Sequence, residues 1–197
     1  MRIRVKLGLI VILIALIAAI PLSFYILHKA EQEKIEQTIS FGKISASLIA
    51  KAAKESYIKE GGDPIDAGIE ARDNIAIFKD QFKMGLAFTQ TILLTRRHKG
   101  VILSQLANSD LLHDNNTIEK YVKLYQSREA LPLTELETLQ KSAEYRDVHC
   151  EKNISEICFF EFLNTSIQVD PETGEKIPVV LSHLLFSKNF VLAPIRK

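Results

Sequence analysis

The chain has 197 residues and a mass of 22.2 kDa, which is enough for one ordinary domain and too little for two sizeable ones. Its 25 Lys and Arg residues nearly balance its 24 Asp and Glu residues, and three of the bases precede a long apolar run. The rest of the chain is mildly acidic, which argues against nucleic-acid binding, because such binding needs a concentrated basic face. Two cysteines are too few for a disulfide-dense scaffold or a four-cysteine zinc site.

The first predicted element is a membrane-spanning helix over Leu7–Leu27, which has 21 residues and no charge. At about 1.5 Å per residue it would span roughly 30 Å, the thickness of the hydrocarbon core of a bilayer. Residues 1–6 contain three bases and no acid, which favours a short cytoplasmic N-terminus. Residues 28–197 are then expected to form a periplasmic domain at the inner membrane, with the lipid bilayer as a first partner.

A cleaved signal peptide is the alternative to an uncleaved anchor. The apolar run is longer than the roughly 7–15 residues of a signal-peptide core. Ile17 also fits poorly at the small-residue position upstream of a cut after Ala19, and Pro21 follows closely. The sequence therefore favours the uncleaved anchor.

Residues 28–58 are predicted to continue the first helix outward. They contain no proline, and a set of apolar residues falls at spacings compatible with one helical face: Ile35, Ile39, Leu48 and Ala52. Gly61-Gly62 is expected to end this helix. Asp63-Pro64 then begins a second helix, because Asp caps helix N-termini well and Pro fits the first turn. Its apolar face is Ile65, Ile69, Phe78 and Phe82, and Gly85 is its expected end.

A β-hairpin is predicted next, because Ala87–Thr95 and Val101–Leu106 are rich in residues that favour strands. The polar residues 96–100 between them form the turn. Two further helices are expected: one begins near residues 114–117, and one begins at Pro132 and ends near Tyr145.

The C-terminal part is predicted to be β again. Ile157–Val169 and Lys176–Ser187 are long strand candidates, and residues 170–175 form a strong turn sequence between them. Pro178 places the second strand near an edge or at a bulge, and Asn189–Pro194 is expected to be a last short strand. The chain therefore predicts one α+β domain with an antiparallel sheet.

The two cysteines, Cys150 and Cys158, enclose a short loop before the first of these long strands. Outside the cytoplasm an even number of cysteines favours a disulfide, which would fix the entry of the chain into that strand. Two free buried thiols are the alternative. A redox role is not expected, because the sequence has no Cys-x-x-Cys motif.

No motif of a known catalytic chemistry is present in the sequence. The five histidines show no zinc-protease spacing, and a chain with 8 glycines contains no nucleophile elbow, P-loop or dinucleotide fingerprint. We therefore predict a protein that is not an enzyme, with no cofactor and no metal site.

The aromatic C-terminal strands are the best candidate for a ligand site. Phe160 and Phe162 should share one face of their strand, and Phe159 the other. Core packing is the default interpretation. The sharper one is a pocket with four residues as its polar anchors: Glu161, Asn164, Ser182 and His183.

The order of these elements resembles the Cache superfamily, the PAS-like extracytoplasmic sensor domains of chemoreceptors and histidine kinases. Gly42–Ser56 (GKISASLIAKAAKES) is similar to the first long helix of those sensors, and Ile92–Leu106 (ILLTRRHKGVILSQL) is similar to their first sheet hairpin. The resemblance covers residues 28–192 and implies a PAS-like antiparallel sheet with flanking helices. Two departures stand out: the chain has no second span with an output domain, and it has no Trp for the aromatic motif of the amino-acid-binding members.

Two functions follow as expectations. The first is a membrane-anchored sensory module that binds a small molecule and signals through a partner, either as a homodimer or through another membrane protein along the 28–58 helix. The second is a structural subunit of a cell-envelope assembly, such as a secretion, motility or division apparatus. A cavity at the sheet would favour the first function, and a filled sheet with an exposed apolar helix face would favour the second.

Overall fold

The computed structural model of the chain describes residues 2–76, 85–108, 111, 130–150 and 153–196. Within these ranges, side chains are not described at residues 2–12, 14, 16, 18, 74–76, 150, 153–157 and 196. The predicted helix near residues 114–117 and the predicted apolar positions Phe78 and Phe82 lie outside the described residues.

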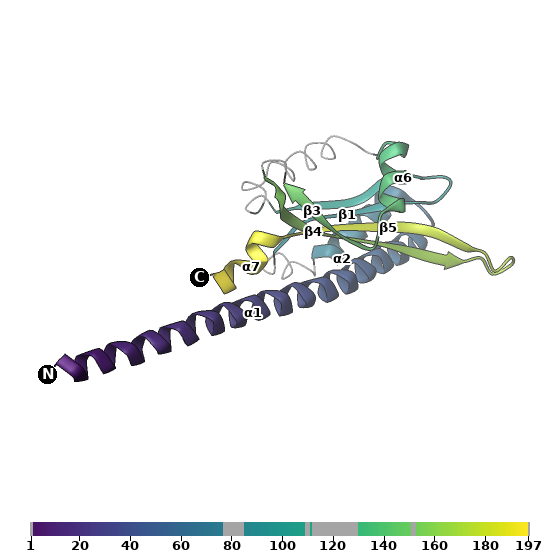
Figure 1. Ribbon diagram of the computed structural model, residues 1–197. Coiled ribbons are helices and arrows are strands. Elements are labelled where there is room, and N and C mark those ends of the chain that lie inside the picture. The colour runs from purple at the N-terminus through teal and green to yellow at the C-terminus, as the bar shows by residue number, and fades with distance from the viewer. Residues whose placement is uncertain (1, 77–84, 109–110, 112–129, 151–152, 197) are drawn as a thin grey trace.

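Two helices begin the chain, as predicted. α1 (Arg2–Lys59) is a single helix of 58 residues, and α2 (Pro64–Ala76) follows after a sharp turn (Figure 1). Gly61 and Gly62 make that turn with φ angles of 61° and 84°, which L side chains adopt reluctantly. The Asp63 side chain accepts a hydrogen bond from the Ile65 N–H at 2.7 Å and so caps α2. The predicted helix break and cap are confirmed.

The prediction of a membrane-spanning helix over Leu7–Leu27, and with it a membrane anchor, is wrong. In the part of the chain that the structure describes, no helix combines the length and the apolar character that a membrane crossing requires. A crossing helix needs about 20 predominantly apolar residues. The predicted periplasmic location stays a prediction.

A five-stranded antiparallel sheet forms the centre of the domain, in the order β2-β1-β5-β4-β3 (Figure 1). The strands are β1 (Leu86–Leu93), β2 (Ile102–Ala107), β3 (Tyr145–Cys150), β4 (Asn153–Val169) and β5 (Lys176–Ser187). Both predicted hairpins and the α+β class are confirmed. Pro178 pairs with Ile167 next to a register shift, the bulge position that its missing N–H favours.

One predicted helix near the sheet is confirmed but ends early, and one predicted strand is wrong. The helix that begins after Pro132, α6 (Leu133–Lys141), ends before Tyr145, where strand β3 begins instead. Asn189–Pro194 is not a strand but part of helix α7 (Lys188–Arg196). The β ladder ends where the Ser187 N–H bonds the Gly85 carbonyl at 2.8 Å. Val191, Leu192 and Ile195 then pack on the core at helical spacing.

Helices cover the two faces of the sheet unequally. α1, α2 and α7 pack against one face, where the buried core includes Phe160, Phe162, Leu184 and Phe186. α6 packs against the other face, over Phe159, Leu163, Leu181 and Leu185. Phe160 and Phe162 therefore share a face that Phe159 does not, as predicted.

The face of α1 that packs on the sheet differs from the predicted one. Ile35 and Ile39 pack against the core, but Leu48 is 49% exposed and points away from it. Small residues occupy the packing face instead: Gly42, Ala46, Ala50 and Ala53. They allow a close approach of helix and sheet, and a Cβ atom at Gly42 would overlap the Phe162 ring. A search for large apolar residues finds only part of this face, because close packing here also depends on small ones.

The predicted disulfide is described only in part. Cys158 is buried, 1% exposed, and disulfide-bonded, so it is not one of two free thiols. The side chain of Cys150 lies outside the described residues, and no geometry of a Cys150–Cys158 bond is described. The pairing of these two cysteines therefore stays a prediction.

Candidate ligand-binding site

A row of polar side chains crosses the sheet on the face that α6 covers. Arg146 on β3 lies directly opposite Glu161 on β4, and His183 on β5 lies directly opposite Gln90 on β1. Gln105 on β2 lies opposite Gln90 and continues the row. Directly opposed residues of antiparallel strands project to the same face. The five strands thus contribute one polar residue each to this row.

Glu161 is the centre of an ion-pair network. Its Oε2 atom accepts a hydrogen bond from the Arg146 Nε–H, and its Oε1 atom accepts one from His183 Nε2 at 2.6 Å. The side chains of Glu161 and His183 are fully buried, whereas the Arg146 side chain is 38% exposed. A buried carboxylate needs such partners, because taking a lone charge out of water costs several kcal/mol.

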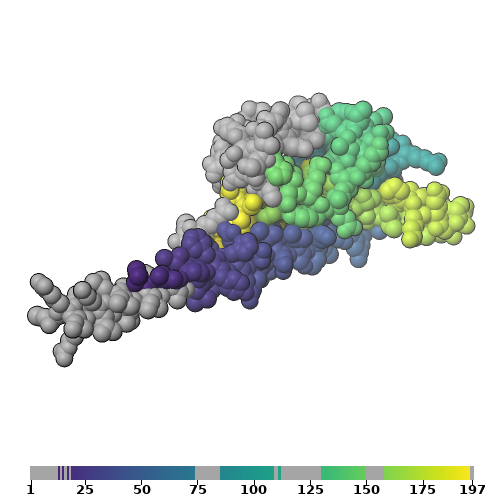
Figure 2. Space-filling model, viewed as in Figure 1, coloured from purple at the N-terminus to yellow at the C-terminus, as the bar shows by residue number. Residues whose placement is uncertain are grey.

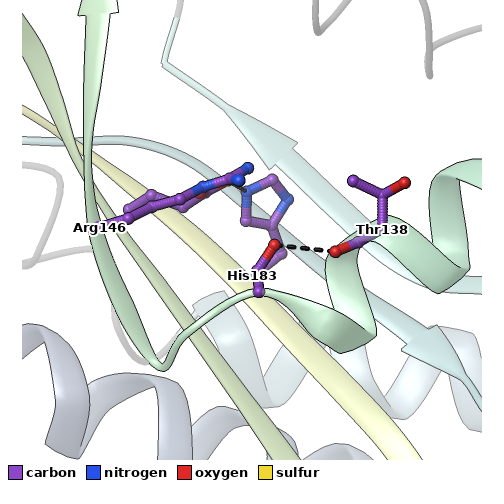
Figure 3. A network of polar contacts seen from close by, with 5 residues as sticks. Thr138, Arg146 and His183 are labelled. Carbon is purple, nitrogen blue, oxygen red and sulfur yellow. Dashed lines mark hydrogen bonds and ion pairs between the residues drawn. The ribbon is translucent and has the colours of Figure 1, made fainter.

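His183 is neutral in this environment. Burial, and then the positive charge of Arg146, lower the pKa of His183 to about 3. The hydrogen bond to the Glu161 carboxylate places the proton of the neutral ring on Nε2. Arg146 reaches from β3 toward the imidazole, with Thr138 of α6 drawn beside this network (Figure 3). The Phe88 ring packs edge-on against the imidazole, with centroids 5.7 Å apart.

The low pKa of His183 predicts a specific pH dependence of stability. Between pH 3 and 6.5 the unfolded histidine binds a proton that the folded one does not, so stability is complete above pH 6.5 and is lost as the pH falls. We expect the free energy of unfolding to fall by about 2 kcal/mol more in the wild type than in His183→Gln between pH 7 and 5. Urea unfolding at both pH values measures it. Equal losses in the two proteins would show that His183 is not held neutral.

Gln90 has unused hydrogen-bonding capacity. The side chain is completely buried, and its Nε2–H group donates to Gln105 Oε1 at 3.3 Å. Among the described residues, the Gln90 Oε1 atom has no hydrogen-bond partner. An unsatisfied buried acceptor costs about 1–3 kcal/mol, so the row carries a polar group that stability alone does not explain.

A hollow of about 260 Å³ lies next to this row, between α6 and strands β4 and β5. Leu163 and Leu181 contribute to its apolar wall; Leu163 pairs with His183, and Leu181 is two residues from it on β5. Its polar lining is Gln140, Ser142, Glu144, Asn164 and Thr165. At roughly 30 Å³ per water-sized unit, the space suits a ligand of about nine non-hydrogen atoms.

The structure brings together some of the predicted anchors and separates others. Glu161 and His183 form the buried pair. Asn164 borders the hollow, but it lies opposite Ser182, so its side chain projects to the other face of the sheet. Ser182 faces α1 on the opposite side of the sheet, where its hydroxyl donates to the Ala46 carbonyl at 2.6 Å. Ser182 therefore holds helix and sheet together and does not belong to this site. A shift of one residue along a strand reverses the face, and this separates Ser182 from His183.

Two members of the polar row, Arg146 and Gln90, were not predicted. Arg146 lies in β3, whose polar residues Arg146, Asp147 and His149 conceal the alternation of a strand. Gln90 is the one amide within the strand-forming run Ala87–Thr95. A single amide among such residues is the signal from which its place in the row could have been predicted. Among the described residues, no group of three or more His, Cys, Asp and Glu side chains could hold a metal ion.

Comparison of the chain with protein-family models, with curated proteins and with solved structures gives no match. The Cache resemblance therefore stays a prediction.

Proposed function

We propose that this domain binds a small polar molecule in the hollow between α6 and strands β4 and β5, and that it reports the bound state to a partner protein without catalysing a reaction. The observation that carries the proposal is the fully buried Glu161–His183 pair beside a mostly polar hollow. A buried ion pair is weak support for stability, since apolar residues of the same volume often serve as well or better. Its presence next to a hollow of ligand size supports a role in binding.

The proposed route to a partner begins on the opposite face of the sheet. β5 places His183 on the face that α6 covers, beside Glu161, and, one residue earlier, Ser182 toward α1. The Ser182–Ala46 hydrogen bond connects the strand to the long helix. A ligand that shifts β5 would shift α1 through this contact, and the 28–58 segment of α1 is where we place the partner or a second copy of the chain.

A thermal-shift screen of the full chain tests this proposal. Amino acids, organic acids, purines and metal ions are each added to the purified protein, and one chemical class should raise the melting temperature. A ligand that binds only the native state adds about 2.7 kcal/mol of stability at a hundredfold excess over its Kd.

Thr165→Leu should remove this response, because Thr165 lines the hollow and, opposite Leu181, projects to the face that α6 covers. Gln168→Leu, an exposed site on the same strand, is the matched control and should respond like the wild type. A cooperatively melting protein that responds to no class would overturn the proposal.

The second candidate function is a structural subunit of an envelope assembly. The observation that favours it is a set of exposed apolar residues outside the core on α1 and α2: Ile44, Leu48, Ile58, Ile65 and Ile69. Sedimentation of the wild type and of Leu48→Glu, with the exposed Lys43→Glu as control, tests self-association through this surface. Association that only Leu48→Glu abolishes would support the assembly function.

A further inference from the structure

A groove separate from the sheet hollow runs between α1 and α7. Its volume is about 370 Å³, within the range of small-molecule sites. α7 lies along α1 (Figures 1 and 2), and the main lining residues come from both helices and the end of β5: Lys34, Thr38, Phe41, Phe186, Phe190 and Pro194. The groove is on the sheet face opposite to the polar row, so the two sites are independent.

The groove has a charged end and an aromatic end. Lys34 precedes Phe41 by seven residues, about two turns or 10 Å along the helix. At the aromatic end, the Phe41 and Phe186 rings meet edge to face with centroids 6.1 Å apart, and Phe186 is almost fully buried. Phe190 leaves 42% of its surface exposed there, so it offers apolar surface to a ligand in the groove.

Lys34 supplies a positive charge that no acidic side chain among the described residues pairs with. Its side chain is half-buried, and within the described part of the chain it forms no ion pair. Lys29, Lys51 and Lys59 on the same helix each have an acidic partner within 3.9 Å. A cation next to an apolar groove favours a ligand with one negative charge and an apolar body.

We propose that this groove binds a free medium-chain monocarboxylate, with the carboxylate at Lys34 and the alkyl chain against Phe41, Phe186 and Phe190. The volume fits about 12 non-hydrogen atoms at roughly 30 Å³ each, which is the size of decanoate. A two-chain lipid is several times larger, so the groove selects the free acid.

Titration calorimetry of decanoate into the full chain tests this inference, below the concentration at which decanoate forms micelles. The wild type should bind one equivalent with saturation. Lys34→Met keeps the apolar stem and removes the charge, and we expect at least about tenfold weaker binding. Lys43→Met, an exposed site on the same helix, is the matched control and should bind like the wild type.

Two further measurements test whether the charge of Lys34 binds the carboxylate. Decanol, which lacks the charge, should bind the wild type and Lys34→Met equally weakly. The ¹³C resonance of carboxyl-labelled decanoate should shift with the wild type and return toward its free position with Lys34→Met. Equal affinity of the two proteins for decanoate, absence of saturable binding, or binding to anionic phospholipid vesicles alone would overturn the proposal. Thr165→Leu should leave decanoate binding unchanged, which separates this site from the sheet hollow.

Discussion

Replacing Arg146 with Met should destabilise the domain by about 3 kcal/mol or more at pH 7.5. Arg146 holds the charge of Glu161, which is completely buried, and the neutral His183 on the other side supplies a hydrogen bond but no charge. Removal of one partner from a buried ion pair costs about 3–5 kcal/mol, because the other charge stays buried and unpaired. Urea unfolding at pH 7.5 measures the loss.

The matched double variant separates charge from packing. Arg146→Met with Glu161→Gln removes both charges, and the Gln amide oxygen still accepts the hydrogen bond from His183. This double variant should recover most of the stability that Arg146→Met loses.

Lys59→Met is the surface control for the same chemistry. The Lys59–Glu70 pair has a 2.8 Å contact, but the Lys59 side chain is 68% exposed, so its loss should change stability little. If Arg146→Met cost no more than Lys59→Met, the buried pair would not depend on Arg146.

Replacing Phe162 with Ala should cost about 3–5 kcal/mol, because its ring is completely buried in the core beneath α1. The ring packs edge to face on Phe186 with centroids 5.6 Å apart and lies next to Tyr145. It also occupies the space that a Cβ atom at Gly42 would need. The helix approaches the sheet at this point only because residue 42 has no side chain.

This contact predicts that the effect of Gly42→Ala on the free energy of unfolding differs in sign between the wild type and the Phe162→Ala protein. In the wild type, Gly42→Ala should destabilise by about 1–3 kcal/mol, because overlap with Phe162 exceeds the gain of about 1 kcal/mol in helix propensity. In the Phe162→Ala protein the same substitution should be neutral or stabilising, because the methyl group enters vacated space.

Chemical unfolding of the four proteins measures the coupling between Gly42 and Phe162. Ser40→Ala, at an exposed site on α1, is the control and should change stability little in either background. Additive effects of Gly42→Ala and Phe162→Ala would contradict the close approach of helix and sheet.

Only part of the candidate site could be predicted from the sequence. Glu161 and His183 stand out because each interrupts an apolar run of a strand, and the structure joins them. Arg146 could not be assigned, because its strand is short, polar and recognisable only when paired with β4. The prediction of Ser182 as an anchor is wrong, because its side chain projects to the face of the sheet that α1 covers.

The sequence by itself determined the local elements that have strong signals. The Gly61-Gly62 turn, the Asp63 cap and the two hairpins follow from residues within a few positions of one another. Tertiary structure decided the rest. The packing face of α1 depends on Phe162, more than a hundred residues away, and α7 is a helix because its apolar residues meet the core at helical spacing. The packing face of α1 and the helical state of α7 depend on contacts between residues far apart in the sequence. Local propensity does not encode these contacts.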